Sequence, residues 1–221
     1  ALWLEPLVEG EIDGRRIGYP NANADSASSI LDGTHNSIGE VDSFEWLAKQ
    51  DRITYKRVGI IDPLSLNDYE AHGGFVGLER AKKMSGAEIV AEVTESGLRG
   101  RGGAGFPAGI KWKTVLDAKS DQKYVCCNAD EGDSGTFADR ILMEGDPFTL
   151  IEGMAIAALA VGATKGFIYV RSEYPAAIKT LRRAIEIAKP KLENFELKVR
   201  VGAGSYVCGE ETAMLESLEG K

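Results

Sequence analysis

A glycine-rich segment with basic side chains, residues 97–112, has the composition of a phosphate-binding loop. Its glycines lack the Cβ atoms that keep a ligand away from the backbone, so consecutive N–H groups can point at an anion. Arg99, Arg101 and Lys111 add positive charges to these dipoles. We therefore expect the loop, including Gly103, to hold the phosphate of a nucleotide. A flexible glycine turn with solvated charges is the alternative.

Gly100, Gly102 and Gly105 match the pattern G-x-G-x-x-G, which indicates a Rossmann turn only when a strand precedes it and a helix follows. Here a helix is expected to precede it, because Ser85-Gly-Ala-Glu88 is a capping box before an apolar face that stops at Gly97. This order disfavours a simple Rossmann dehydrogenase. The two histidines of the chain lie outside every motif and offer no catalytic group for such an enzyme.

An acidic segment, residues 128–135, follows an expected strand and therefore lies at a strand's carboxyl end, where open α/β sheets bind ligands. Asn128 can both donate and accept hydrogen bonds, and Asp130, Glu131 and Asp133 can accept them from a ribose or a flavin ring. A solvated acidic turn is the alternative. A divalent metal site is a further option, although the spacing does not match an EF-hand loop.

A third segment, residues 202–212, has the order strand, glycine turn and helix start. The first turn of a helix offers another anion site. Glu210 and Glu211 also suit the dipole of any helix, so a purely capping role is the alternative for them. Tyr206 could stack on an aromatic ring or fill the core.

The elements that must position these segments follow from hydrophobic periodicity and from glycine and proline breaks, which predict an α/β fold. Helices are expected at about 65–72, 74–84, 86–96, 110–119, 147–161 and 175–189, and strands at 123–128, 165–171 and 196–201. Strands separated by helices imply a largely parallel core sheet. Earlier in the chain we expect a hairpin over 1–20 that turns at Asp13-Gly14, a short helix at 42–50 and an extended piece at 58–61.

Composition excludes several classes of protein. The 221 residues carry a formal net charge of −8 and an isoelectric point near 5.0, which disfavours nucleic acid as the main partner. The longest apolar stretch, Met154 to Val161, is far shorter than the roughly 20 residues of a membrane span. The cysteines, Cys126, Cys127 and Cys208, lack zinc or iron–sulfur spacing and are expected to be buried thiols of a cytoplasmic protein.

Four motifs together carry a family resemblance. They are Gly-Leu-Arg-Gly-Arg-Gly-Gly-Ala-Gly-Phe-Pro-Ala-Gly-Ile-Lys-Trp at 97–112, Asn-Ala-Asp-Glu-Gly-Asp-Ser-Gly-Thr-Phe at 128–137, Glu-Gly-Asp-Pro at 144–147 and Tyr-Val-Cys-Gly-Glu-Glu-Thr-Ala at 206–213. The chain resembles the family of flavin subunits found in respiratory complex I, NAD-linked hydrogenases and NAD-dependent formate dehydrogenases. Residues 62–74 and 2–6 look most like the β subunit of a formate dehydrogenase.

The resemblance implies an FMN/NADH-binding domain with a Rossmann-like parallel sheet. Residues expected around FMN are Gly100, Arg101, Gly102, Gly103, Lys111, Asn128, Asp130, Tyr206, Gly209 and Glu210. Phe106, Glu131 and Glu211 are expected to contact the dinucleotide. No side chain is assigned a catalytic step, because hydride passes directly between nicotinamide and flavin, and Glu211 and Asp133 are expected to tune the flavin.

The resemblance also implies an organisation and partners. Residues 1–20 are expected to end a preceding thioredoxin-like domain, 21–63 to form a linker, and 64–221 to form the FMN/NADH domain without its C-terminal part. Iron–sulfur clusters are expected in absent parts of the subunit and in partner subunits. The expected partners are a molybdenum- or tungsten-containing formate dehydrogenase α subunit and a small 2Fe–2S thioredoxin-like γ subunit, in a hetero-oligomer that reduces NAD⁺. The alternatives are the equivalent flavin-binding polypeptide of a hydrogenase or of complex I, and a non-catalytic scaffold.

Overall fold

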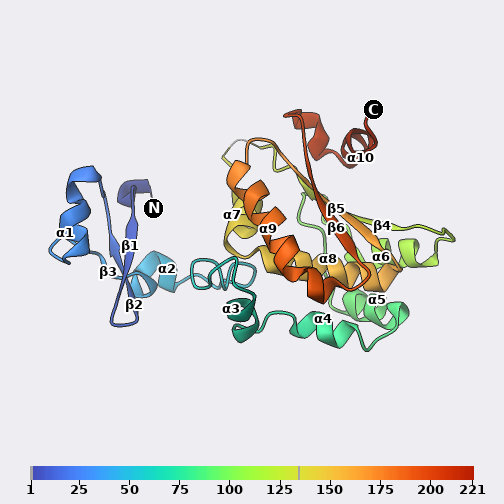
Figure 1. Cartoon of the computed structure of the whole chain (residues 1–221), viewed down its shortest axis with the longest axis horizontal. Coiled ribbons are helices and arrows are strands. Elements are labelled where there is room, and N and C mark those ends of the chain that lie inside the picture. Colours follow the sequence, from blue (N-terminus) through green and yellow to red (C-terminus); the bar gives the residue numbers. More distant parts are fainter. Residues whose placement is uncertain (1, 134) are drawn as a thin grey trace. The chain divides into compact units, whose positions relative to one another are not determined.

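The computed structural model describes residues 2–133 and 135–221; Ala1 and Ser134, which fall in the expected hairpin segment and acidic motif, lie outside the described residues. The chain forms two compact units, residues 1–53 and 54–221. Figure 1 shows the secondary structure of each unit, and each is described here by itself.

The first unit contains the expected hairpin. β1 (Val8–Ile12) and β2 (Arg15–Tyr19) pair antiparallel, with Val8 opposite Tyr19 and Ile12 opposite Arg15. The turn residues Asp13 and Gly14 have φ angles of 52° and 73°. Positive φ at both central positions is what a tight two-residue hairpin requires, and the Asp-Gly pair supplies it. The hairpin prediction is therefore confirmed.

Residues 21–53, expected as part of a linker, fold onto this hairpin. The remaining elements of the unit are α1 (Ala27–Leu31), β3 (Gly39–Glu40), α2 (Glu45–Ala48) and three short 3₁₀ helices at Leu2–Leu4, Ala24–Ser26 and Val41–Ser43. β3 pairs antiparallel with β2, and the side chains of Ile38 and Val41 lie directly over Gly18. This apolar contact holds the segment to the sheet. That residues 1–20 end a thioredoxin-like domain stays a prediction.

The second unit is an α/β domain built on a parallel sheet, as expected. Its strands are β4 (Tyr124–Ala129), β5 (Lys165–Val170) and β6 (Glu196–Val201) in the order β4-β5-β6. Its helices are α3 (Leu66–Ala71), α4 (Val76–Ala81), α5 (Gly86–Glu95), α6 (Ala108–Asp117), α7 (Ala138–Gly145), α8 (Pro147–Val161), α9 (Pro175–Leu192) and α10 (Glu211–Glu219). Ala129, Val170 and Val201 are register partners, so the three strands end level with one another. The segments that follow them meet at one edge.

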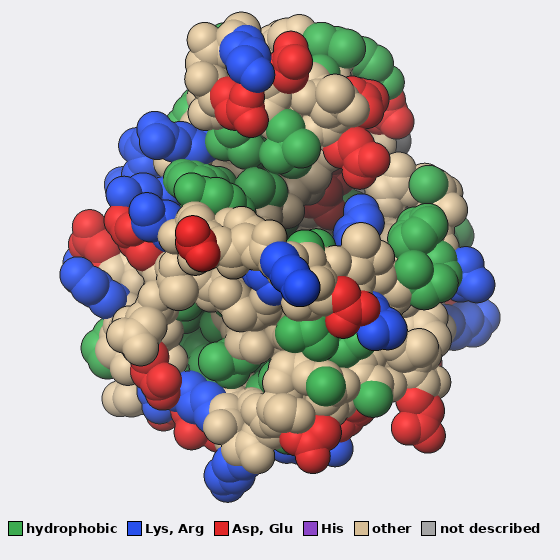
Figure 2. Space-filling model, turned by 90° about the vertical axis from the view of Figure 1, so that its right-hand side faces the viewer, with side chains coloured by type: hydrophobic (Ala, Val, Ile, Leu, Met, Phe, Trp, Pro, Cys, Tyr) green, Lys and Arg blue, Asp and Glu red, His purple; other side chains and the backbone are tan. Residues whose placement is uncertain are grey.

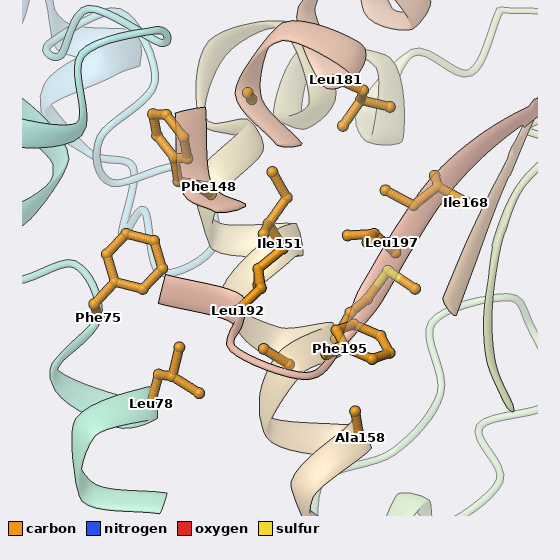
Figure 3. Close-up of a cluster of buried hydrophobic side chains, with 14 of the residues drawn as sticks. Phe75, Leu78, Phe148, Ile151, Ala158, Ile168, Leu181, Leu192, Phe195 and Leu197 are labelled. Atoms are coloured by element: carbon orange, nitrogen blue, oxygen red, sulfur yellow. The ribbon is translucent and has the colours of Figure 1, made fainter. Parts of the chain in front are cut away.

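The main core lies between the sheet and α8. Alternate residues of β5, Ile168 and Val170, are fully buried against Ile151 and other side chains of α8 and α9. Figure 3 shows Ile151 and Ile168 in one cluster with Leu78 of α4 and Leu197 near the start of β6. On the other face of the sheet, Tyr169 packs with Cys208 and the α10 residue Met214. No helix in the described part of the chain is long and apolar enough to span a membrane.

Two local expectations differ from the structure, and one helix was not expected. Residues 58–61 form consecutive turns, not an extended piece. α9 continues past Pro190 to Leu192, because a proline so close to a helix end removes only one hydrogen bond. α7 was not expected: Phe137 at its N-cap makes no side-chain cap, and the first amides of the helix are capped instead by Glu131.

The two helices that flank the glycine-rich loop pack closely through Gly109, and this contact gives a first prediction. A Cβ added to Gly109 would lie 2.2 Å from Thr94 Oγ1 and 2.7 Å from Thr94 Cα. Overpacking of this kind costs about 1–3 kcal/mol, against a gain of about 1 kcal/mol in helix propensity. We expect Gly109→Ala to lower the free energy of unfolding by about 1 kcal/mol, as measured by urea denaturation.

Gly153 in α8 is the matched control. A Cβ there meets nothing within 4 Å. We expect Gly153→Ala to raise the free energy of unfolding by about 0.5–1 kcal/mol, because it only restricts the unfolded chain. Equal stability changes in the two variants would contradict the close packing of α5 on α6.

Candidate functional site

The glycine-rich loop projects its backbone into open space. Leu98 and Phe106 carbonyls accept hydrogen bonds from the amides of Ala108 and Gly100, each over 2.9 Å, and close the loop at its base. Beyond this base, Gly103 and Gly105 have positive φ angles of 109° and 60°. A Cβ added at either position, or at Gly102, would meet nothing within 4 Å, and Arg101 and Phe106 are exposed. A ligand can therefore reach the backbone directly.

α6 begins where the loop ends, and no side chain caps it at Pro107. Its first amide groups and its dipole are thus available to an anion. Lys111, one turn into α6, keeps an exposed ammonium group. Arg99 has a different role, because its Nη1 donates to the Gly105 carbonyl over 2.9 Å and braces the loop from within. The arrangement suits a phosphate group.

Asn128 and Asp130 follow β4 at the carboxyl edge of the sheet. Asn128 Nδ2 donates to the Gly209 carbonyl over 2.8 Å, and its Oδ1 accepts the Asp130 amide over 3.2 Å. Asp130 Oδ2 is buried and has no hydrogen-bond partner among the described residues. Burial raises the pKa of Asp130, against the lowering effect of the Arg171 charge. An unpartnered buried acceptor at this edge is what a ligand donor would satisfy.

Glu131 is buried and supplies the cap that α7 lacks locally. Its Oε1 accepts the Asp139 amide over 2.9 Å, and its Oε2 accepts the Arg140 amide over 3.2 Å. A carboxylate at this position also suits the positive end of the helix dipole. The Tyr174 hydroxyl lies 3.1 Å from the same Oε2. A contact between Glu131 and a dinucleotide stays a prediction. In the structure, this carboxylate accepts hydrogen bonds from the first amides of α7.

In the third segment, residues 202–212, the side chains of Tyr206, Glu210 and Glu211 differ in their contacts. Tyr206 is 70% exposed, so it does not fill the core. Its hydroxyl donates to Asp133 Oδ1 over 2.7 Å, and this contact raises the pKa of Tyr206. Glu210 caps α10 by accepting the Ala213 amide over 2.9 Å, and such backbone hydrogen bonds lower the pKa of Glu210. Glu211 is the first residue of α10, after this cap, and its side chain is exposed.

Tertiary contacts bring the three segments together. Asn128 meets Gly209, Asp133 meets Tyr206, and Lys111 Nζ lies 3.8 Å from Glu211 Oε2. Figure 2, which views the side of the molecule near α5, α6 and α10, shows a hollow below α10 where acidic and basic side chains meet. Among residues 2–133 and 135–221, no group of three or more His, Cys, Asp or Glu side chains is placed to hold a metal ion. A cavity of about 250 Å³ lies elsewhere, beside the segments that precede β5 and β6.

The sequence did not single out two side chains that hold the acidic segment, Arg171 and Tyr174. The Arg171 Nη1 donates to the Glu131 carbonyl, and its guanidinium lies 5.1 Å from the centre of the Tyr174 ring. Arg171 directly follows β5, so its position after a parallel strand was the available signal.

The comparison with known proteins agrees with this geometry. Residues 93–221 match the Nuo51 FMN-binding domain, and the matched region contains all of the candidate site. The chain belongs to this family. The expected membership of the family of flavin subunits is thereby confirmed.

Individual members of the Nuo51 FMN-binding domain family are similar over most of the chain. It is 51% identical over 183 residues to the NADP-reducing hydrogenase subunit HndC of Solidesulfovibrio fructosivorans, covering 78% of this chain and 37% of that relative. It is 49% identical over 180 residues to the F 2 subunit of NADH-quinone oxidoreductase from Rhizobium meliloti strain 1021, covering 76% of this chain and 43% of that relative. The chain thus spans about two fifths of these relatives.

A solved structure shows the same fold. The chain aligns over its full length with 38% of a chain in the crystal structure of an NAD⁺-reducing NiFe hydrogenase in the air-oxidised state, with a TM-score of 0.64 and 32% sequence identity. This similarity confirms the α/β fold class.

Proposed function

We propose that the chain is the FMN- and NAD(H)-binding part of an oxidoreductase that moves electrons between NAD(H) and iron–sulfur clusters. The observation that carries the proposal is the meeting of the three segments at the carboxyl edge of the sheet, through Asn128–Gly209, Asp133–Tyr206 and Lys111–Glu211. These segments lie within the matched FMN-binding domain.

The residues present fit FMN. The open backbone from Gly100 to Gly105, with Arg101 and Lys111, would hold the phosphate, because amides, a helix N-terminus and cations converge there. The unpartnered Asp130 Oδ2 and the amide of Asn128 would hydrogen-bond the rest of the cofactor. When bound, FMN supplies the ability to exchange a hydride with nicotinamide and single electrons with iron–sulfur clusters.

The remaining site residues would handle the dinucleotide. Phe106, expected at the dinucleotide, and Tyr206, expected around FMN, both have exposed rings that can stack on a planar base or nicotinamide. Asp133 and Glu211 are exposed carboxylates on opposite segments and can accept hydrogen bonds from ribose hydroxyls or an amide. Their work is orientation, because hydride transfer depends on the two rings lying at the correct distance and angle.

For the assembly, we propose the β subunit of a cytoplasmic NAD⁺-dependent formate dehydrogenase with a molybdenum- or tungsten-containing α subunit and a small 2Fe–2S γ subunit. The segments 62–74 and 2–6 support this assignment by their resemblance to that β subunit. The similarity to components of a hydrogenase and of an NADH-quinone oxidoreductase supports the second candidate, the flavin-binding polypeptide of one of those complexes.

The first experiment tests the cofactors. The purified chain is titrated with FMN while flavin fluorescence and visible absorbance are recorded, and NADH is then added without oxygen. We expect stoichiometric binding and bleaching of the yellow chromophore. A chain that is folded by circular dichroism but does not bind FMN would support a scaffold role instead.

The second experiment tests the assembly. The tagged protein is purified with its native partners, which are analysed for molybdenum, tungsten and nickel, and NAD⁺ reduction is assayed separately with formate and with hydrogen. Molybdenum or tungsten with formate-dependent activity supports the first assembly. Nickel together with hydrogen-dependent NAD⁺ reduction identifies the second candidate. So does quinone reduction by NADH when neither formate nor hydrogen supports NAD⁺ reduction.

A further inference from the structure

Arg171 lies at the same edge of the sheet as the acidic segment. It directly follows β5, and because Ala129 and Val170 are register partners, Arg171 and Asp130 leave neighbouring strands side by side. The Arg171 side chain is only 19% exposed. An arginine so largely buried must be held by specific contacts, since its charge costs free energy when removed from water.

The contacts of Arg171 converge on the backbone and helix start around Glu131. Its Nη1 donates to the Glu131 carbonyl, and its Nη2 donates to Glu173 Oε1 over 3.0 Å. Its guanidinium also lies over the ring of Tyr174, whose hydroxyl is 3.1 Å from both Glu131 Oε2 and the Thr136 carbonyl. Arg171 and Tyr174 thus hold both the main chain and the side chain of Glu131.

Tyr206 contacts the two residues that follow Glu131. The Tyr206 ring covers Gly132, since a Cβ added there would lie 2.9 Å from Tyr206 Cδ2. The Tyr206 hydroxyl donates to Asp133, the next residue. Residues 131–133 are therefore contacted by both Arg171 and Tyr206, and the position of the Asp133 carboxylate depends on both.

Stability of the fold does not by itself account for this arrangement. Arg171 Nε and Asp130 Oδ2 are both buried, and neither has a hydrogen-bond partner within the described residues. Buried donors and acceptors are otherwise paired almost throughout folded proteins. Each unpaired buried atom of this kind calls for an explanation, and a functional role of the side chain is one.

We propose that Arg171 is a positioning residue for the dinucleotide: through the Glu131 carbonyl it fixes the 131–133 backbone, and thereby the Asp133–Tyr206 pair against which NADH binds. The inference rests on the proposed function. The residues proposed to bind the FMN phosphate lie in a different segment, from Leu98 to Lys111. Loss of Arg171 therefore leaves the proposed contacts to the FMN phosphate in place and affects NADH binding.

The variants are Arg171→Gln, Arg171→Lys and, as a control, Arg183→Gln, which removes an arginine from an exposed ion pair with Glu186 on α9. FMN content, the Michaelis constant for NADH and kcat are measured with ferricyanide as electron acceptor. For Arg171→Gln we expect the Michaelis constant to rise about tenfold, because NADH binding must then order residues 131–133 itself. FMN content and kcat stay within about twofold of the parent. Arg171→Lys, which keeps the positive charge and one donor nitrogen, shows a smaller rise in the Michaelis constant. Arg183→Gln behaves as the parent.

An unchanged Michaelis constant in Arg171→Gln overturns the proposal. A parallel loss of FMN content, kcat and thermal stability in both Arg171 variants also overturns it, because that pattern reports a structural role only. A separate measurement keeps this result distinct from failure of the proposed function: amide hydrogen exchange at Gly132 and Asp133 in the cofactor-free chain. We expect faster exchange in Arg171→Gln than in Arg183→Gln, and equal exchange overturns the inference whether or not the parent binds FMN.

Discussion

Replacing Lys111 with methionine is expected to weaken FMN binding about 10- to 100-fold, the range for losing a hydrogen bond between charged groups. Lys111 lies one turn into α6, whose N-terminus has no side-chain cap. Its side chain is 60% exposed, and its contact with Glu211 spans 3.8 Å, so it is free to turn toward a phosphate. Methionine keeps most of the length of the side chain and removes only the charge. Fluorescence titration with FMN measures the effect.

Lys113 provides the matched control, because it lies on the same helix and pairs with Asp117 over 2.7 Å. Lys113→Met changes the net charge by the same amount and should leave FMN affinity within about twofold of the parent. Thermal stability should change little in either variant, since exposed ion pairs contribute at most about 1 kcal/mol. Equal weakening by both substitutions would show that overall charge, not a contact at Lys111, determines FMN affinity.

Replacing Asp146 with alanine is expected to lower the free energy of unfolding by about 3–5 kcal/mol, a large share of the roughly 5–15 kcal/mol of a typical domain. Asp146 is fully buried at the junction of α7 and α8. Its Oδ2 accepts hydrogen bonds from Arg57 Nε over 2.8 Å and from the Thr149 hydroxyl over 2.7 Å. The substitution leaves the buried Arg57 guanidinium without its counter-charge, and urea denaturation measures the loss.

Two further variants separate the causes. Asp146→Asn keeps the shape and one acceptor oxygen but removes the charge, so a loss close to that of alanine identifies the ion pair as the main contribution. Glu92→Gln removes an acid from the exposed pair with Arg80, in which the Arg80 and Glu92 side chains are 67% and 45% exposed. It should cost at most about 1 kcal/mol. A loss in Asp146→Ala no larger than in Glu92→Gln would contradict a stabilising buried pair.

Much of the fold follows from signals between residues close in sequence. Ser85 and Glu88 form the predicted capping box, Asp13-Gly14 forms the predicted turn, and Pro147 begins α8 as predicted. Each of these depends on backbone angles or hydrogen bonds within a few residues, so the local amino acids alone determine the outcome. The same reasoning placed the three parallel strands and the loops at their ends.

Contacts outside these local patterns, most of them between residues far apart in the sequence, decided the rest. α7 begins at a residue with no local cap and depends on Glu131, which its own segment does not contain. Asp133 and Tyr206 are 73 positions apart, and Asn128 and Gly209 are 81 apart, so no periodicity could pair them.

For the candidate site, the residue types and their order along the chain predicted a phosphate-binding loop, one acidic segment and a third segment with a glycine turn before a helix, because glycine, lysine and carboxylates have these properties wherever they lie. Only the tertiary structure showed which side chains meet, that Glu131 caps α7, and that Arg171 holds the acidic segment. The physical reason is that the packing of α10 and β5 beside β4 determines these contacts, and packing depends on the whole chain.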